Sequence, residues 1–187
     1  MIYCVGDSML NNARYVGYNQ SVLDHLRNIS EKENNKMKFT MLAQDGARIS
    51  DVYSQLTAIK QSDNPITIIL SVGGNDLLAE DAEPREQFHQ WLNLVNAIQI
   101  QFYDSSIKIF VLGLYYPQTQ TRFFDRIRQW NQWQKINKYT VISTDDIITE
   151  SKDICYKIEP SNQGGSKIAS KIVNYLSGFN KIMLKFY

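Results

Sequence analysis

The sequence predicts a three-layer α/β/α sandwich built on a mostly parallel sheet of five strands. Two observations lead to this fold class. Apolar runs alternate with segments of helical periodicity along the whole chain of 187 residues, and several of the runs are continuous in Val, Ile, Leu and Phe. Continuous apolar runs are typical of strands that are covered on both faces. Repeated alternation of strand and helix favours right-handed crossovers, with helices on both sides of a parallel sheet.

Each expected element has its own signal in the sequence. The five apolar runs that we interpret as strands cover residues 2–5, 37–42, 66–72, 107–114 and 140–143. Amphipathic segments separate these strands, and the first of them begins at Ser21, with Asp24 placed as in a capping box. A final amphipathic segment begins near Ser166. No linker, repeat or low-complexity tract interrupts the pattern, so residues 1–187 are expected to form a single domain.

Composition and charge disfavour several classes of protein. Hydrophobic residues make up 43% of the chain and charged residues 21%, and the formal net charge is +1. This composition is close to average globular usage, which disfavours disorder and membrane spanning. The low net charge gives no electrostatic basis for binding nucleic acid or an anionic membrane. Because the first apolar run directly follows Met1, without a charged leader, we expect a cytoplasmic protein.

The sequence predicts neither a metal site nor a cofactor. Cys4 and Cys155 give no disulfide framework and no metal-ligand spacing, and we interpret them as structural thiols of a reducing compartment. The two histidines are isolated, and the carboxylates show no paired spacing for a metal. Gly73 and Gly74 lack the further glycine and the acidic residue of a dinucleotide-binding fingerprint.

Three glycine-containing blocks follow the first three expected strands, and together they suit acyl transfer. They are Gly6-Asp7-Ser8, Gly46 and Gly73-Gly74-Asn75-Asp76. All three lie past the carboxyl ends of parallel strands, where open α/β sheets bind their ligands. Ser8, on a tight turn, would present a nucleophilic hydroxyl. Its own N–H, the backbone of Gly46 and the side-chain amide of Asn75 would be donors for the oxyanion of a tetrahedral intermediate.

These blocks resemble those of the SGNH (GDSL-type) hydrolases. The matching segments read Gly6-Asp7-Ser8-Met9-Leu10, Ala43-Gln44-Asp45-Gly46-Ala47 and Gly73-Gly74-Asn75-Asp76-Leu77. The resemblance extends over nearly the whole chain and implies the flavodoxin-like α/β/α fold of that family. It also implies that Ser8 is the nucleophile and that Gly46 and Asn75 are oxyanion donors.

The last block of the family has a counterpart here, but its histidine is missing. Family members usually show Asp-x-x-His, often followed by Pro and a glycine-containing helix start, and residues 160–165 match that continuation. When the chain is aligned on Pro160, the histidine position holds Glu159 and the aspartate position holds Tyr156. When it is aligned on Asp153, the histidine position holds Tyr156.

Glu159 and Asp153 are therefore the candidate bases. His25 and His89, the two histidines of the chain, lie on polar sides of expected helices, so we interpret them as surface or structural residues. A glutamate with an ordinary pKa of about 4.3 is a poor base toward a serine hydroxyl, and burial would raise that pKa.

The sequence leaves three functions open. The first is an SGNH-type ester hydrolase in which Ser8 attacks the acyl group with a non-standard base. The second is a catalytically degenerate protein that binds an acylated or carbohydrate ligand. The third is an O-acyltransferase that moves an acyl group to a sugar hydroxyl. The expected partner is a small-molecule ester or an acylated carbohydrate, and the segment Tyr115-Tyr116-Pro117 is expected to line the cleft that binds it.

Overall fold

A five-stranded parallel sheet forms the centre of the computed structural model, which describes residues 1–32, 37–62, 64–103, 105–117 and 120–183. The strand order is β2-β1-β3-β4-β5, and every neighbouring pair is parallel. The strands are β1 (Ile2–Gly6), β2 (Phe39–Met41), β3 (Ile66–Ser71), β4 (Ile107–Leu112) and β5 (Thr140–Ile142). The predicted sheet is confirmed.

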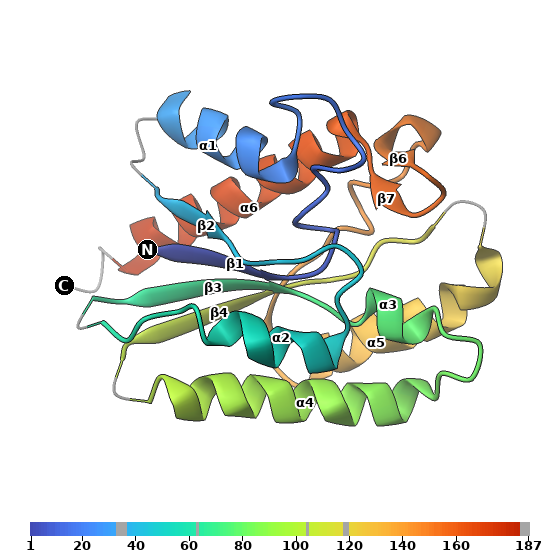
Figure 1. Cartoon of the computed structure of the whole chain (residues 1–187), viewed down its shortest axis with the longest axis horizontal. Coiled ribbons are helices and arrows are strands. Elements are labelled where there is room, and N and C mark those ends of the chain that lie inside the picture. The colour runs from blue at the N-terminus through green and yellow to red at the C-terminus, as the bar shows by residue number, and fades with distance from the viewer. Residues whose placement is uncertain (33–36, 63, 104, 118–119, 184–187) are drawn as a thin grey trace.

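Helices cover both faces of the sheet and give the predicted three layers (Figure 1). On one face α1 (Val22–Lys32) packs against α6 (Asn162–Met183). On the other face α4 (Pro84–Gln101) lies between α2 (Ile49–Leu56) and α5 (Phe124–Ile136) and contacts both. The short helix α3 (Gly74–Leu77) follows β3. Among the described residues, no helix is long and apolar enough to span a membrane.

The core explains the continuous apolar runs of the sequence. Ile68, Ile69 and Leu70 of β3 are all completely buried, although their side chains alternate between the two faces of the sheet. Each such side chain contributes roughly 1.5–3 kcal/mol by leaving water. Trp91 of α4 and Trp130 of α5 meet edge to face in the second helical layer, with ring centroids 6.0 Å apart. A strand covered by helices on both faces therefore has apolar side chains on both faces, and its sequence shows no alternation of polar and apolar residues.

Some boundaries differ from the predicted ones for local reasons. The strand β2 is shorter than predicted because it lies at the edge of the sheet and pairs with β1 over residues 39–41 only. The helix α6 begins at Asn162 and not near Ser166, because the Ser161 hydroxyl accepts a hydrogen bond from the Gly164 N–H at 3.2 Å and caps it. An antiparallel ribbon of β6 (Ile154–Cys155) and β7 (Glu159–Pro160) was not predicted.

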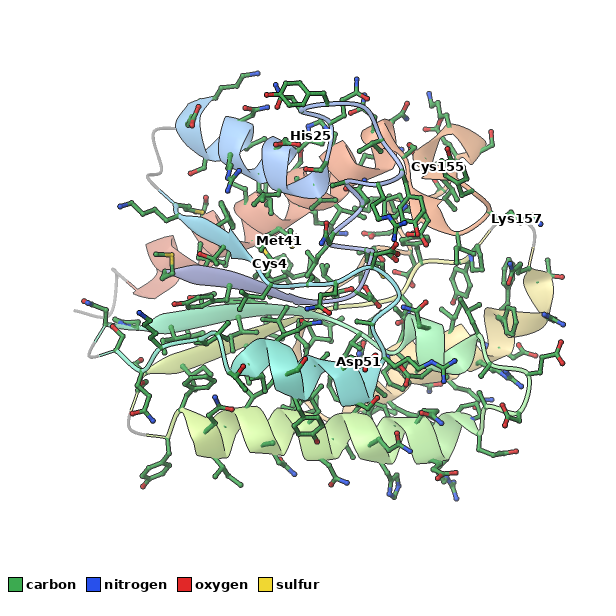
Figure 2. All side chains as sticks on the ribbon, in the orientation of Figure 1. Cys4, His25, Met41, Asp51, Cys155 and Lys157 are labelled. Atoms are coloured by element: carbon green, nitrogen blue, oxygen red, sulfur yellow. The ribbon has the colours of Figure 1, made fainter. Side chains whose placement is uncertain are left out.

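The strand order places the first and third glycine blocks together. The chain passes from β1 outward to β2 and then back beyond β1 to β3, so β1 and β3 are neighbours. Their following loops leave the sheet toward opposite faces, which opens a crevice at the carboxyl edge. The β6–β7 ribbon, marked by Cys155 and Lys157, lies toward this same edge of the sheet, as does Asp51 near the start of α2 (Figure 2).

Candidate active site

Ser8 lies on a tight turn that directly follows β1. Gly6 has a φ of +129°, and a Cβ at this position would lie 1.7 Å from the Ser71 carbonyl oxygen, so only glycine fits. The Asp7 carboxylate accepts hydrogen bonds from the Ser71 hydroxyl at 2.9 Å and from the Met9 N–H at 3.1 Å. These contacts fix the turn and leave the Ser8 side chain 7% exposed.

The Asp7 carboxyl beside the nucleophile has an unusual titration. Burial raises its pKa to about 7, the hydrogen bonds from Ser71 and Met9 lower it, and the charge of Glu159 raises it again. Near neutral pH this group is therefore divided between its protonated and ionised forms. The average negative charge of Asp7 beside Ser8 is therefore smaller than that of a fully ionised aspartate.

Asn75, at the start of α3, reaches across to the second glycine block. Its side-chain nitrogen donates to the Ala47 carbonyl oxygen at 2.9 Å. An amide group carries two hydrogens, so this contact orients the Asn75 side chain and leaves a second donor. The second block is itself bound to the first, because the Gln44 N–H donates to the Gly6 carbonyl at 2.9 Å. All three blocks thus meet at one edge of the sheet.

Gly46 lies where the three blocks meet, on the side that is exposed to solvent. It has a φ of +76°, and a Cβ there would meet no atom within 4 Å, so the position favours glycine by backbone conformation and not by crowding. Gly46 directly precedes Ala47, the partner of Asn75, and is exposed. It is not one of the described residues that line the pocket beside Ser8.

Glu159 lies on β7 and lines the same pocket as Ser8, close enough for its carboxylate to interact with the Ser8 side chain. The residue is 7% exposed. Burial raises the pKa of Glu159, the interaction with Ser8 partly offsets this, and the negative charge of Asp45 raises it further. The chain therefore places a buried carboxylate with increased proton affinity against the serine hydroxyl. Of the two candidate bases, Glu159 is the one that lines the pocket together with Ser8.

Asp153 faces away from this contact. It is 0% exposed, and its carboxylate accepts hydrogen bonds from the Lys167 ammonium at 2.8 Å and from the Gln163 side chain at 3.0 Å. The N–H groups of Thr149 and Glu150 donate to it as well. Burial alone would raise the pKa of Asp153, but these donors outweigh burial and hold that pKa below its ordinary value. Asp153 joins α6 to the preceding loop and is not among the described residues that line the pocket.

The histidines and cysteines form no alternative centre. The His25 ring, on α1 (Figure 2), hydrogen-bonds with the Asn162 side chain at 2.9 Å. Neither histidine is among the described residues that line the pocket. Burial raises the pKa of the Cys155 thiol, and it raises that of Cys4 to about 12, so both stay protonated at neutral pH. Within the described residues, no group of three or more His, Cys, Asp and Glu side chains could hold a metal ion.

One pocket of about 60 Å³ brings Ser8, Asn75 and Glu159 together. Asp7 lines it as well, and most of the remaining wall is apolar. Of the segment expected at the cleft, Tyr115 and Pro117 are lining residues. The Tyr115 hydroxyl donates to the Ile158 carbonyl, which fixes the residue before Glu159. The pocket thus combines a hydroxyl, a carboxylate and an amide donor with a largely apolar wall.

Sequence reasoning missed Asn12, the side chain that fastens the first block to the last. Its amide nitrogen donates to the Pro160 carbonyl at 3.0 Å. Asn12 lies a few residues after Ser8, but the match to the first block of the family ends before it. The residues around a polar loop residue do not indicate a hydrogen-bond partner that lies so far away in the sequence. Such a residue becomes recognisable only when the two blocks are placed together.

Comparisons with known proteins identify the fold. No protein-family model matches the sequence, and no curated protein sequence matches it. Among solved structures, a member of the lipolytic protein G-D-S-L family from Veillonella parvula DSM 2008 is similar with a TM-score of 0.74 at 16% identity, over 92% of this chain and 96% of that chain. The psychrotrophic esterase EstA from Pseudoalteromonas sp., inhibited by monoethylphosphonate, is similar with a TM-score of 0.71 at 13% identity, over 96% of this chain and 98% of that chain.

A third similar structure is an acetyl xylan esterase, AlAXEase, with a TM-score of 0.69 at 12% identity, over 93% of this chain and 98% of that chain. All three likenesses extend over nearly the full length of both chains. The chain therefore has the fold of these GDSL lipolytic proteins and esterases. The fold that the sequence resemblance implied is confirmed.

Proposed function

We propose that the chain is an ester hydrolase in which Ser8 is the nucleophile and Glu159 is the general base. One observation carries this proposal: the buried Glu159 carboxylate interacts with the Ser8 side chain at a pocket that both residues and Asn75 line. The esterases that share the fold support it. The proposed substrate is a small-molecule ester, and an acylated carbohydrate is one class that this includes.

In the first half of the reaction, the Ser8 oxygen attacks the acyl carbonyl carbon while Glu159 accepts the hydroxyl proton. The resulting tetrahedral intermediate carries a negative charge on the former carbonyl oxygen. The Ser8 N–H, the second hydrogen of the Asn75 amide and the backbone of Gly46 are the proposed donors to this oxyanion. When the intermediate collapses, the bond to the alcohol oxygen breaks, and the protonated Glu159 returns its proton to the leaving alcohol.

In the second half, water replaces the alcohol. Glu159 accepts a proton from the water as its oxygen attacks the acyl-serine. Collapse of this second intermediate returns the proton to the Ser8 oxygen and releases the carboxylic acid. One carboxyl group thus accepts and donates one proton in each half, which is the work that a histidine performs in related triads. We assign Asp153 to the scaffold that holds α6 and not to the reaction.

The raised pKa of Glu159 moves this carboxylate toward the basicity that the role requires. A general base works best when its pKa lies near the working pH, and burial moves glutamate in that direction. The charge of Asp45 acts on the same group and favours its protonated form. Glu159 therefore holds a proton more readily than an exposed glutamate during the lifetime of each intermediate.

The proposal is tested by hydrolysis of p-nitrophenyl butanoate and by labelling with a serine-directed fluorophosphonate. The wild-type protein should hydrolyse the ester and be labelled at Ser8, and Ser8→Ala should lose both properties. Glu159→Gln should lower kcat by roughly 10²–10⁴-fold, the usual contribution of a general base. Glu86→Gln, on the exposed side of α4, is the matched control and should keep full activity.

Three outcomes would contradict the proposal. Full activity in folded Glu159→Gln protein would remove Glu159 as the base. Absence of both hydrolysis and labelling in the wild-type protein would favour a binding protein with a degenerate site. Product that forms only after a sugar acceptor is added would instead identify an O-acyltransferase.

A further inference from the structure

The pocket beside Ser8 has a wall built mainly from apolar side chains of three separate elements. Leu77 ends α3 and Leu78 directly follows it, Leu114 follows β4, Phe123 directly precedes α5, and Ile127 lies in the first turn of α5. Leu78 is half-buried, and the other four side chains are almost completely buried. These side chains have no polar groups for a ligand to bind, so the pocket favours an alkyl group.

The size of the pocket limits what that alkyl group can be. The pocket has a volume of about 60 Å³, well below the roughly 150 Å³ of an apolar cavity that binds benzene. It therefore favours a short alkyl group. A longer chain would have to extend out of the pocket or displace well-packed side chains of its wall, and each overpacked site costs roughly 1–3 kcal/mol.

Outside this pocket, the surroundings of Glu159 are polar and charged. The Tyr15 hydroxyl donates to the Asp45 carboxylate at 2.7 Å, and the Arg14 guanidinium donates to the same carboxylate at 3.2 Å. Both Tyr15 and Asp45 interact electrostatically with Glu159. An alkyl chain placed here would remove water from hydrogen-bonded and charged groups, which is unfavourable. A polar alcohol would keep those groups hydrogen-bonded.

We infer that the apolar pocket between α3 and α5 binds the acyl chain of the substrate, and that its small volume selects short acyl groups. The alcohol of the ester then lies on the polar side, near Tyr15 and Asp45. This inference rests on the proposed hydrolase function and deepens it by naming the substrate class: short-chain esters of polar alcohols. Long-chain fatty acyl esters are disfavoured, because their chains are too large for a pocket of about 60 Å³.

The test is a series of p-nitrophenyl esters from acetate to decanoate. The value of kcat/KM should be highest between butanoate and hexanoate and should fall at least tenfold by decanoate. Leu78→Ala enlarges the pocket and should move the optimum to longer chains, whereas Leu78→Trp should move it toward acetate. Leu92→Ala is the matched control, because Leu92 is also a half-buried leucine but is not among the described pocket residues.

A second measurement does not depend on turnover. Alkylboronic acids from methyl to octyl place an alkyl chain beside a serine hydroxyl, and their binding can be followed by the melting temperature of the protein. Butyl and pentyl boronic acids should stabilise the protein more than octyl boronic acid does. This preference for the shorter boronic acids should be lost in the Leu78→Ala variant and kept in the Leu92→Ala variant.

The outcomes separate the two proposals. Hydrolysis that stays constant or increases through decanoate would overturn the chain-length inference and leave the hydrolase proposal standing. Absence of hydrolysis with every ester would overturn the hydrolase proposal, and the boronic acid series would then decide whether the pocket binds short alkyl groups. Equal or stronger stabilisation by octyl boronic acid would overturn the pocket assignment itself.

Discussion

Asn12 and Pro160 are joined by a hydrogen bond of 3.0 Å, although 148 residues separate them in the sequence. The Asn12 amide nitrogen donates to the Pro160 carbonyl, and its amide oxygen accepts from the Val22 N–H at 2.8 Å. This completely buried side chain connects the loop after Ser8, the strand of Glu159 and the start of α1. The position of the proposed base relative to the nucleophile therefore depends on Asn12.

The first prediction follows from this link. Asn12→Asp keeps an acceptor for the Val22 N–H but replaces the donor to Pro160 with a second acceptor. Glu159 should then move relative to Ser8, and kcat for p-nitrophenyl butanoate should fall on the order of 10²-fold, as expected for displacements near 1 Å. KM should change little, because the apolar pocket is built from other elements. Asn93→Asp, on the exposed side of α4, is the control. Unchanged kcat in folded Asn12→Asp protein would mean that the link does not position the base.

The fold could be predicted from the sequence because its signals are local. A strand such as β3, covered on both faces, must be apolar throughout, and a crossover helix must show its apolar side at regular spacing. The glycine blocks were equally recognisable, since Gly6 fits against Ser71 only without a side chain. The edge strand β2 was predicted too long because apolar residues continue beyond its pairing with β1.

The β6–β7 ribbon could not be predicted, and the contact between Glu159 and Ser8 depends on it. Tyr156 and Lys157 have φ values of 46° and 75°, and these two residues reverse the chain between the strands. Such turns usually contain Gly, Asn or Asp, so a Tyr-Lys pair gives no signal of a hairpin. The sequence therefore left both Asp153 and Glu159 as candidates. Only the hairpin and its bond to Asn12 turn Glu159 inward, while Asp153 faces Lys167.

The second prediction concerns the oxyanion. Asn75→Ala removes the proposed side-chain donor and should lower kcat by roughly 10²–10³-fold, with a much smaller effect on KM. It also removes the hydrogen bond to Ala47, which should decrease the free energy of unfolding by about 1 kcal/mol. Steady-state kinetics and urea unfolding separate the two effects, and Asn93→Ala serves as the control. Retention of wild-type kcat would remove Asn75 from the reaction.

A third prediction compares two buried glutamines. The Gln55 side chain donates to the Gly6 carbonyl at 2.9 Å and accepts from the Gly6 N–H at 2.7 Å. Gln134 is 0% exposed, and neither atom of its amide has a hydrogen-bond partner among the described residues. Gln134→Met should therefore increase the free energy of unfolding by roughly 1–3 kcal/mol, and Gln55→Met should decrease it by a similar amount or more. Urea unfolding measures both, and changes of the same sign would contradict the argument.

The fourth prediction is a pH dependence of stability that arises from Asp153. Because its pKa is lowered in the folded chain, its contribution is fully present above the ordinary aspartate pKa of about 3.9 and is lost as the pH falls through the folded value. Asp153→Asn should decrease the free energy of unfolding by about 2 kcal/mol at pH 7, and the difference from wild type should shrink in acid. Asp125→Asn, in an exposed ion pair with Arg128, should have little effect at any pH. A difference that stays constant from pH 7 to pH 2 would mean that the Asp153 charge is not its source.

The last prediction concerns the pH dependence of hydrolysis. Glu159 must be ionised to accept the Ser8 proton, so kcat/KM should rise with pH through the pKa of Glu159 and then reach a plateau. Since burial raises that pKa, the rise should lie above the range of an exposed glutamate. The charge of Asp45 raises it further, so Asp45→Asn should move the midpoint to lower pH. Asp125→Asn should leave the midpoint in place.

Asp7 also titrates, with a pKa of about 7, and its substitution separates the two groups. If Asp45→Asn left the midpoint unchanged while Asp7→Asn removed the rise, the controlling carboxyl would be Asp7 and not Glu159.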